Sequence, residues 1–176
     1  MSWLLKCFKV LTLGIVLNLI LGVAQSFADA VTYMESYTNN VNGVTGIQGI
    51  SDVAVSPDGK FVYTASYQAS AVSVFERNPV TGQLTYRSSK TGLSAAFSVD
   101  VSSDNKSVYV ASPTGSVVIA LSRDLTTGEL TETNRLGGSP TGGFVSVSTS
   151  PDAKTVYGVG GSPSGLVVFN RDATTG

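Results

Sequence analysis

The amino-acid sequence predicts an all-β fold built from repeated antiparallel sheets, on two observations. One phrase of fourteen residues occurs three times, as VAVSPDGKFVYTAS from Val53, VDVSSDNKSVYVAS from Val99 and VSTSPDAKTVYGVG from Val147. A tyrosine, an arginine and a glycine, which we use as markers of the repeat, also each recur after 46 residues and again after a further 48. They are Tyr63, Tyr109 and Tyr157; Arg77, Arg123 and Arg171; and Gly82, Gly128 and Gly176. A fixed period of this length is typical of repeat architectures.

Each repeat divides into four short extended runs, which in the first repeat cover about 52–56, 61–66, 71–77 and 84–89. The runs are rich in Val, Tyr, Phe and Thr, which favour strands, and no window of helical length carries an apolar stripe. PDGK separates the first two runs and NPVTGQ the last two. Proline, aspartate and glycine favour tight turns, so we expect neighbouring runs to pair antiparallel.

The third run of each repeat indicates how the sheets pack. AVSVF, VVIAL and LVVF are apolar on both faces of a strand. A strand that is buried on both faces belongs to a sheet packed between other sheets. Four-stranded sheets stacked face to face are the blades of a β-propeller, so the sequence predicts a partial β-propeller. A β-sandwich is the alternative, but it would not require the same turn residues in the same register three times.

The first residues have the features of an export signal. Two lysines precede an apolar run over 10–24, and small residues follow it. This pattern predicts a helical signal peptide over 1–28, cleaved after Ala28 or else after Ala30, and a protein in the periplasm, at the cell surface or in the medium. A membrane anchor is the alternative, although the run is shorter than the roughly 20 apolar residues that span a bilayer.

Two stretches resemble repeats of known families. SPDGKFVYTAS with AVSVFERNPVTGQLTY is similar to the repeat of the β-propeller lactonase family, and VYTASYQASAVSVF resembles the YVTN repeats of surface propellers. The likeness covers about 31–176. It implies a seven-bladed, phosphogluconolactonase-like propeller whose members use charged loop residues, histidine among them, around the channel. The sequence holds no histidine, and none of those positions can be matched here.

The repeats divide the mature chain into one partial unit and three blades. We expect a lone outer strand and loop at 29–42, a first blade at 43–90, a second at 91–138 and an incomplete third at 139–176. Propellers have about 4 to 8 blades. The sequence therefore suggests a shortened or fragmentary propeller, or self-association in which Val31–Tyr37 of one molecule supplies the fourth strand of another molecule's third blade.

Composition excludes several classes of chemistry. Removal of the signal leaves nine basic and twelve acidic side chains, a balance that argues against nucleic acid as a partner. The signal also contains the single cysteine, Cys7. Without histidine or a mature cysteine, the usual nucleophile and base pairs of acyl transfer cannot be assembled. We therefore predict no catalytic residue, no metal site and no cofactor, and interpret the recurring Asp58, Asp104 and Asp152 as turn formers.

Three residues stand out as candidate ligand contacts. Asp100 lies between two valines in the innermost strand of the second repeat. Its side chain should therefore face either the channel or the neighbouring blade. Its alternative role is a carboxylate bonded to nearby backbone amides. Asp52 begins the innermost strand of the first repeat. Its side chain either contacts a ligand at the mouth of the channel or caps the junction between loop and strand. Tyr67 is a loop residue with no counterpart in the other repeats, and unshared loop residues often carry specificity.

The recurring arginines and tyrosines have structural interpretations. We expect the arginines to face outward and to bond the adjacent turn or a neighbouring carboxylate. We expect the tyrosines to pack between blades.

Three functions are compatible with these features. The first is an exported binding or interaction module of the cell envelope, for a protein, a glycan or a small molecule, in contact with the membrane only if the signal is retained. The second is a lactonase-like hydrolase related to phosphogluconolactonase. The third is a structural protein of the surface-layer type.

Overall fold

The computed structural model describes residues 31–137 and 142–174. The predicted signal helix over 1–28 lies outside the described residues and stays a prediction. The chain divides into two compact units, Met1–Glu35 and Ser36–Gly176, and every strand that the structure describes belongs to the second. Within the described ranges no helix is long and apolar enough to cross a membrane.

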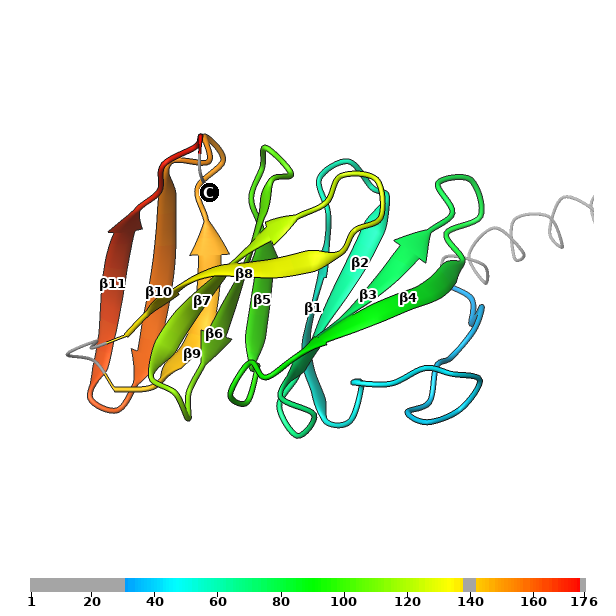
Figure 1. Ribbon diagram of the computed structural model, residues 1–176, viewed down its shortest axis with the longest axis horizontal. Helices are drawn as coiled ribbons and strands as arrows, with labels where there is room; N and C mark the ends of the chain where they lie inside the picture. Colours follow the sequence, from blue (N-terminus) through cyan, green and yellow to red (C-terminus); the bar gives the residue numbers. More distant parts are fainter. Residues whose placement is uncertain (1–30, 138–141, 175–176) are drawn as a thin grey trace, which may run out of the picture. The chain divides into compact units, whose positions relative to one another are not determined.

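The second unit consists of three antiparallel sheets, which we call blades 1, 2 and 3 (Figure 1). Blade 1 contains β1 (Ile50–Val55), β2 (Phe61–Ser66), β3 (Ala71–Arg77) and β4 (Leu84–Thr91). Blade 2 contains β5 (Ser98–Val101), β6 (Ser107–Ser112), β7 (Val117–Arg123) and β8 (Leu130–Leu136). Blade 3 contains β9 (Phe144–Thr149), β10 (Thr155–Gly161) and β11 (Ser164–Asn170). Within each blade, each strand pairs with the next along the chain, so the predicted all-β partial propeller is confirmed.

The recurring aspartates form the turns between the first and second strands. In blade 1, Ser56 Oγ donates to Asp58 Oδ1 at 2.6 Å, and the Lys60 N–H donates to the same oxygen at 3.1 Å. Gly59 follows the aspartate with a φ of 69°, in the left-handed region that glycine adopts without strain. The equivalent turn of blade 2 repeats the serine bond to Asp104 Oδ1 at 2.6 Å. The interpretation of these aspartates as turn formers is therefore confirmed.

The apolar core lies between the blades. Valines on one face of blade 2, among them Val99 and Val108, pack against the side of blade 1 that carries Tyr63 and Val72. The opposite face of blade 2 packs against blade 3 in a second cluster that includes Phe144. All of these side chains are buried. Blade 2 is thus covered on both faces, which explains why its third strand is apolar on both sides.

An arginine from each following blade reaches back into the preceding one. Arg123 of blade 2 has a fully buried side chain, and its Nη2 donates to Asp58 Oδ2 at 2.8 Å. Its Nε donates to the Tyr63 hydroxyl at 2.8 Å, while its Nη1 donates to the Asn105 carbonyl at 2.9 Å. The guanidinium also lies 5.2 Å from the centre of the Phe61 ring. We call this set of contacts between an aspartate, a tyrosine and the next blade's arginine the arginine clamp.

A second arginine clamp joins blades 2 and 3. Arg171 donates from Nε to the Tyr109 hydroxyl at 2.8 Å and from Nη1 to Asp104 Oδ2 at 2.9 Å. Its Nη1 also donates to the Ala153 carbonyl at 2.7 Å. The two clamps therefore repeat the same bonds one blade apart.

The expectation that the arginines face outward is wrong for Arg123 and Arg171, because the blade interface buries both. Their bonds to a turn carbonyl and to a neighbouring carboxylate are as expected. The interpretation of Tyr63 and Tyr109 as packing between blades is confirmed, since both are buried in the interfaces. Burial raises the pKa of Tyr63 to about 12.

The marker glycine of the outer hairpin has a steric role in blade 2. Gly128 has a φ of 75°, and a Cβ at this position would lie 2.4 Å from Cδ1 of Phe61 in blade 1. Its carbonyl accepts a hydrogen bond from the Tyr63 hydroxyl at 3.1 Å. The hairpin of one blade therefore touches the clamp of the preceding blade, and only a residue without a side chain fits.

Removal of Arg123 from its arginine clamp should destabilise the protein. We expect Arg123→Ala to lower the free energy of unfolding by about 1–3 kcal/mol, because the buried Tyr63 hydroxyl and the Asn105 carbonyl then lose a charged hydrogen-bond donor. Urea unfolding would measure this change. Arg87→Ala is the matched control, since Arg87 pairs with Glu76 at the surface and such pairs contribute about 0–1 kcal/mol. Equal losses in both variants would contradict the structural role of the clamp.

The two arginine clamps should also make the stability of the protein fall at acid pH. Burial by itself raises the pKa of Asp58 and Asp104, but bonds from serine, arginine and backbone N–H outweigh it and hold both pKa values below normal. The unfolded chain therefore binds these protons more tightly, so the stabilisation is full above about pH 4 and falls as the pH drops further. Urea midpoints between pH 7 and pH 3 should fall less steeply for the double variant Asp58→Asn, Asp104→Asn.

Candidate functional site

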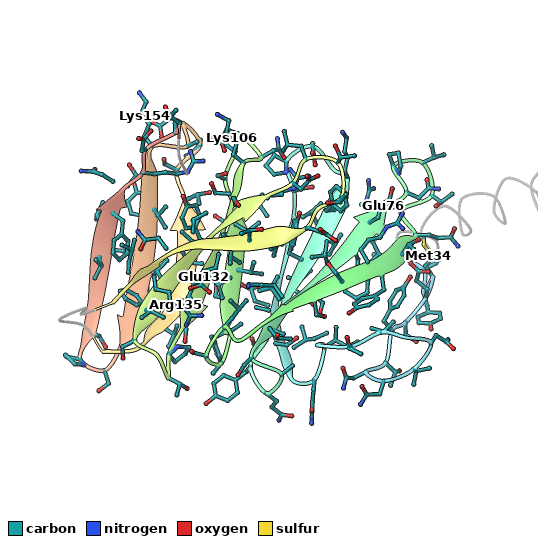
Figure 2. All side chains as sticks on the ribbon, in the orientation of Figure 1. Met34, Glu76, Lys106, Glu132, Arg135 and Lys154 are labelled. Carbon is teal, nitrogen blue, oxygen red and sulfur yellow. The ribbon has the colours of Figure 1, made fainter. Side chains whose placement is uncertain are left out.

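Two kinds of connection gather at one end of the innermost strands, β1 and β5. They are the loops between second and third strands, at 67–70 and 113–116, and the link from β4 to β5 at 92–97. In Figure 1 these segments lie at the lower end of the sheets, and the aspartate turns lie at the upper end. Figure 2 shows Lys106 and Lys154 at the upper end, beside those turns. Because the lower loops differ between repeats, this end is the candidate functional face.

An exposed aromatic pair lies on this face. Tyr67 is 45% exposed and Phe97 is 38% exposed, and their rings meet edge to face with centres 6.1 Å apart. The Tyr67 N–H donates to the Gly49 carbonyl at 2.9 Å, which holds the β2–β3 loop against the start of β1. Ser51 Oγ donates to the Phe97 carbonyl at 2.6 Å and so attaches the link between the blades to β1. Hydrogen bonds to the backbone of both residues therefore hold the pair in place, and the two residues are partly exposed to solvent.

Asp52 joins the innermost strands of two blades. Its Oδ1 accepts the Val53 N–H at 2.8 Å, and its Oδ2 accepts the Val99 N–H of β5 at 2.9 Å. The side chain is half-buried. Asp52 thus acts as a cap between blades in this structure, and its role as a ligand contact stays a prediction.

Asp100 faces the neighbouring blade. Its Oδ2 accepts the N–H of Thr149 at 2.6 Å and the Thr149 hydroxyl at 2.8 Å, and its Oδ1 accepts the Val101 N–H at 2.9 Å. Thr149 ends β9, the innermost strand of blade 3. The carboxylate is thus bonded to nearby backbone amides, as the alternative role for Asp100 predicts. Its role as a ligand contact stays a prediction.

The three candidates do not form one cluster. Asp52 and Tyr67 lie at the same end of β1, because β1 pairs with the end of β2 there. Asp100 lies within β5 opposite Tyr109, and its bonds are made to blade 3. Phe97, which the sequence analysis missed, completes the pair with Tyr67. It could have been found as another unshared aromatic residue, since the other repeats carry Ser51 and Val145 at its place.

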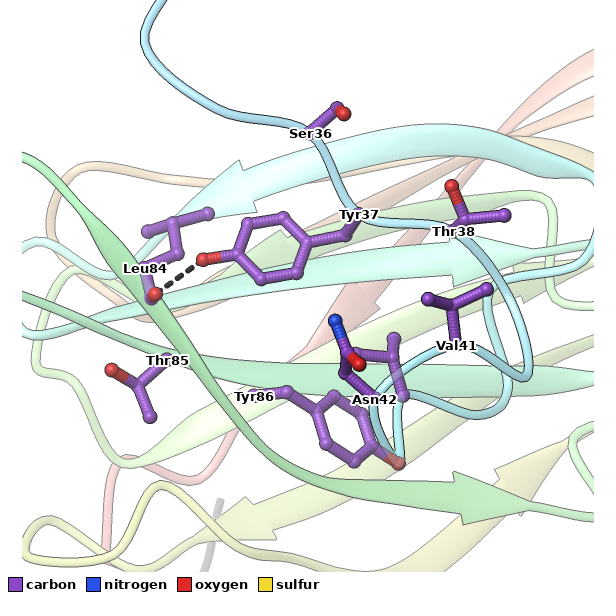
Figure 3. A pocket seen from close by; sticks show the side chains of 9 residues that line it. Ser36, Tyr37, Thr38, Val41, Asn42, Leu84, Thr85 and Tyr86 are labelled. Carbon is purple, nitrogen blue, oxygen red and sulfur yellow. Dashed lines mark hydrogen bonds between the residues drawn. The ribbon is translucent and has the colours of Figure 1, made fainter.

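A hollow formed by described residues lies away from this pair. It has a volume of about 520 Å³ and lies between the segment 36–44 and residues 84–86 of β4 (Figure 3). Tyr37 donates a short hydrogen bond to the Leu84 carbonyl, and its ring packs edge-on against Phe75. None of the described residues that line the hollow has a charged side chain. In the described part of the chain, no three His, Cys, Asp or Glu side chains are grouped to hold a metal ion.

Comparison with protein families identifies the fold. The family model described as "Lactonase, 7-bladed beta-propeller" matches residues 24–147. The chain belongs to this family. Comparison with curated proteins finds no match.

Several solved structures share the fold. A proposed 6-phosphogluconolactonase from Bacteroides uniformis is similar with a TM-score of 0.65 and 20% identity, over 84% of this chain and 44% of that one. A second proposed 6-phosphogluconolactonase, from Bacteroides fragilis, has a TM-score of 0.60 and 23% identity, over 70% of this chain and 35% of that one. The periplasmic gluconolactonase of Pseudomonas aeruginosa has a TM-score of 0.60 and 20% identity, over 72% of this chain and 38% of that one. This lactonase-family chain spans less than half the length of each.

The bonds of Asp100 lead to a stability prediction. We expect Asp100→Ala to lower the free energy of unfolding by about 1–3 kcal/mol, because the partly buried Thr149 N–H loses its acceptor. Asp100→Asn should lose less, since its amide oxygen can still accept. Urea unfolding would measure both variants, with the exposed Glu129→Ala as a control expected to stay within about 0.5 kcal/mol. An unchanged unfolding energy in Asp100→Ala would contradict the structural role.

Proposed function

We propose that this protein is part of an enzyme that opens sugar lactones by hydrolysis. The family match over residues 24–147 carries this proposal. Similar folds that include a gluconolactonase and two proposed 6-phosphogluconolactonases support it. The composition by itself favoured an exported binding module, whereas the family match favours the lactonase alternative.

We assign substrate contact to the face that carries Tyr67 and Phe97. An aromatic ring offers an apolar surface to the C–H groups of a sugar ring, and its edge tolerates water. Both rings are exposed at the loop end of the innermost strands, where a ligand can reach them. In the reaction, water adds to the lactone carbonyl carbon, the ring C–O bond breaks, and the ring oxygen takes a proton to give the open hydroxy acid. We assign no catalytic role to Asp52 or Asp100, because both hold backbone amides of a neighbouring blade.

Binding without turnover is the second candidate. One observation favours it: the two carboxylates on the innermost strands that we considered as ligand contacts bond backbone N–H groups instead of being poised toward a reacting water. Export to the cell envelope remains part of this proposal and rests on the N-terminal pattern alone. The surface-layer alternative stays a prediction.

An assay of lactone opening tests the proposal. We expect the protein to hydrolyse glucono-1,5-lactone or its 6-phosphate faster than the spontaneous reaction, measured as acid release with a pH indicator. Tyr67→Ala and Phe97→Ala should each lower kcat/KM about tenfold, a loss of about 1.4 kcal/mol of transition-state stabilisation.

The matched control is Val80→Ala. Val80 is 92% exposed in the hairpin between β3 and β4, away from the aromatic pair, so the variant should keep the full rate. A rate no faster than the spontaneous one would overturn the enzyme proposal. Saturable binding of the same lactones, without hydrolysis, would then favour the second candidate.

A further inference from the structure

One serine bonds both of the segments that carry the exposed aromatic pair. Ser70 ends the loop between β2 and β3, where its N–H donates to the Tyr67 carbonyl at 3.3 Å and closes the turn. Its own carbonyl accepts the Leu93 N–H at 2.9 Å, and its Oγ accepts the Ala95 N–H at 3.0 Å. Both of these donors belong to the link from β4 to β5, which leads into Phe97. Ser70 therefore joins the loop of one ring to the link of the other.

The link needs such bonds because its backbone follows an unfavourable path. Gly92, Ser94 and Ala95 have positive φ angles of 80°, 52° and 62°. Glycine adopts such angles freely, whereas residues with a Cβ rarely do, and two of them in succession persist only where neighbouring contacts hold them. The two N–H groups that Ser70 accepts lie on either side of Ser94. The serine thus holds the link at its most constrained point.

The link is also shielded from water. Leu93, Ala95 and Ala96 are all buried. A buried backbone N–H has to find its acceptor within the protein, and for Ala95 that acceptor is the hydroxyl of Ser70. Loss of this hydroxyl would therefore make the link move toward another acceptor. Because Phe97 follows two residues later, such a movement changes where its ring lies.

Other bonds attach the two segments to β1, but not to each other. The Tyr67 N–H bonds the Gly49 carbonyl, and Ser51 Oγ bonds the Phe97 carbonyl. The bonds of Ser70 run directly from one segment to the other. The edge-to-face meeting of the rings, with centres 6.1 Å apart, thus depends on this serine as well as on β1.

The second repeat has the same serine without an aromatic pair. Ser116 is the repeat equivalent of Ser70, has the same φ of 48°, and donates from its N–H to the Pro113 carbonyl at 3.2 Å. Pro113 and Val145 take the places of the two aromatic residues there. The serine is therefore part of the frame that two repeats share, and the rings that it positions occur between blades 1 and 2.

We propose that Ser70 is a positioning residue that sets the distance and angle between Tyr67 and Phe97, and through them the binding of a sugar lactone. The consequence for binding rests on the proposed function, whereas the geometry does not. Contact of the rings with the C–H groups of a substrate acts in the ground state and in the transition state alike. Misplaced rings should therefore raise KM and leave kcat nearly unchanged.

Steady-state kinetics of lactone opening tests this consequence. Ser70→Ala removes Oγ and should raise KM about fivefold, with kcat changed less than about twofold. In a protein that already carries Tyr67→Ala and Phe97→Ala, the same change should have no further effect on kcat/KM, since the rings through which Ser70 acts are gone. Equal effects in the two backgrounds would overturn the proposal.

Ser116→Ala is the matched control. It removes the hydroxyl at the same place and the same φ in the next repeat, and should leave KM unchanged. Ser70→Gly, which adopts a positive φ without strain, provides a second variant without the hydroxyl if Ser70→Ala folds poorly.

Nuclear Overhauser contacts between the ring protons of Tyr67 and Phe97 give a readout that needs no substrate. We expect these contacts in the parent protein and in Ser116→Ala, and their loss in Ser70→Ala. Ring contacts that stay unchanged in Ser70→Ala would overturn this inference. A parent protein that shows the ring contacts but does not hydrolyse lactones would overturn the proposed function alone.

Discussion

Each blade of this protein depends on the next one, because every sheet has an apolar flank that only another sheet covers. The arginine clamp adds direction to that dependence. Arg123 and Arg171 are buried cations, and each pairs with an aspartate and a tyrosine of the preceding blade. A buried charge without its partner is costly, so the blades have to stack in one order and one orientation.

The clamp also explains why one phrase returns along the chain. The aspartate of the phrase uses one carboxylate oxygen to hold its own turn and the other to bind the next blade's arginine. The tyrosine of the phrase lies on the second strand, where its hydroxyl reaches the same guanidinium. A single short sequence therefore encodes both a local turn and a contact between blades, and each repeat has to keep both.

The innermost strands show a second use of carboxylates. Asp52 and Asp100 each cross a blade boundary to a backbone N–H, although they occupy different positions in their repeats. Bonds of this kind hold the central strands together and leave the variable loops as the place for specificity. Tyr67 and Phe97 lie in those loops, and they come from different blades that only the stacked arrangement brings together. The family fold thus provides a rigid support, and we propose that recognition rests on residues that the repeats do not share.

The sequence by itself determined the strands, the turns and the period, because turn chemistry at Asp58 and Gly59 and alternating apolar runs act within one repeat. It also indicated that Tyr63 and Tyr109 pack between blades. The burial of Arg123, the bonds from Asp100 to Thr149 and the meeting of Tyr67 with Phe97 were decided only by the tertiary structure. Each of these joins residues of two neighbouring blades, and the stacking angle between the sheets, which no local pattern encodes, sets which atoms meet.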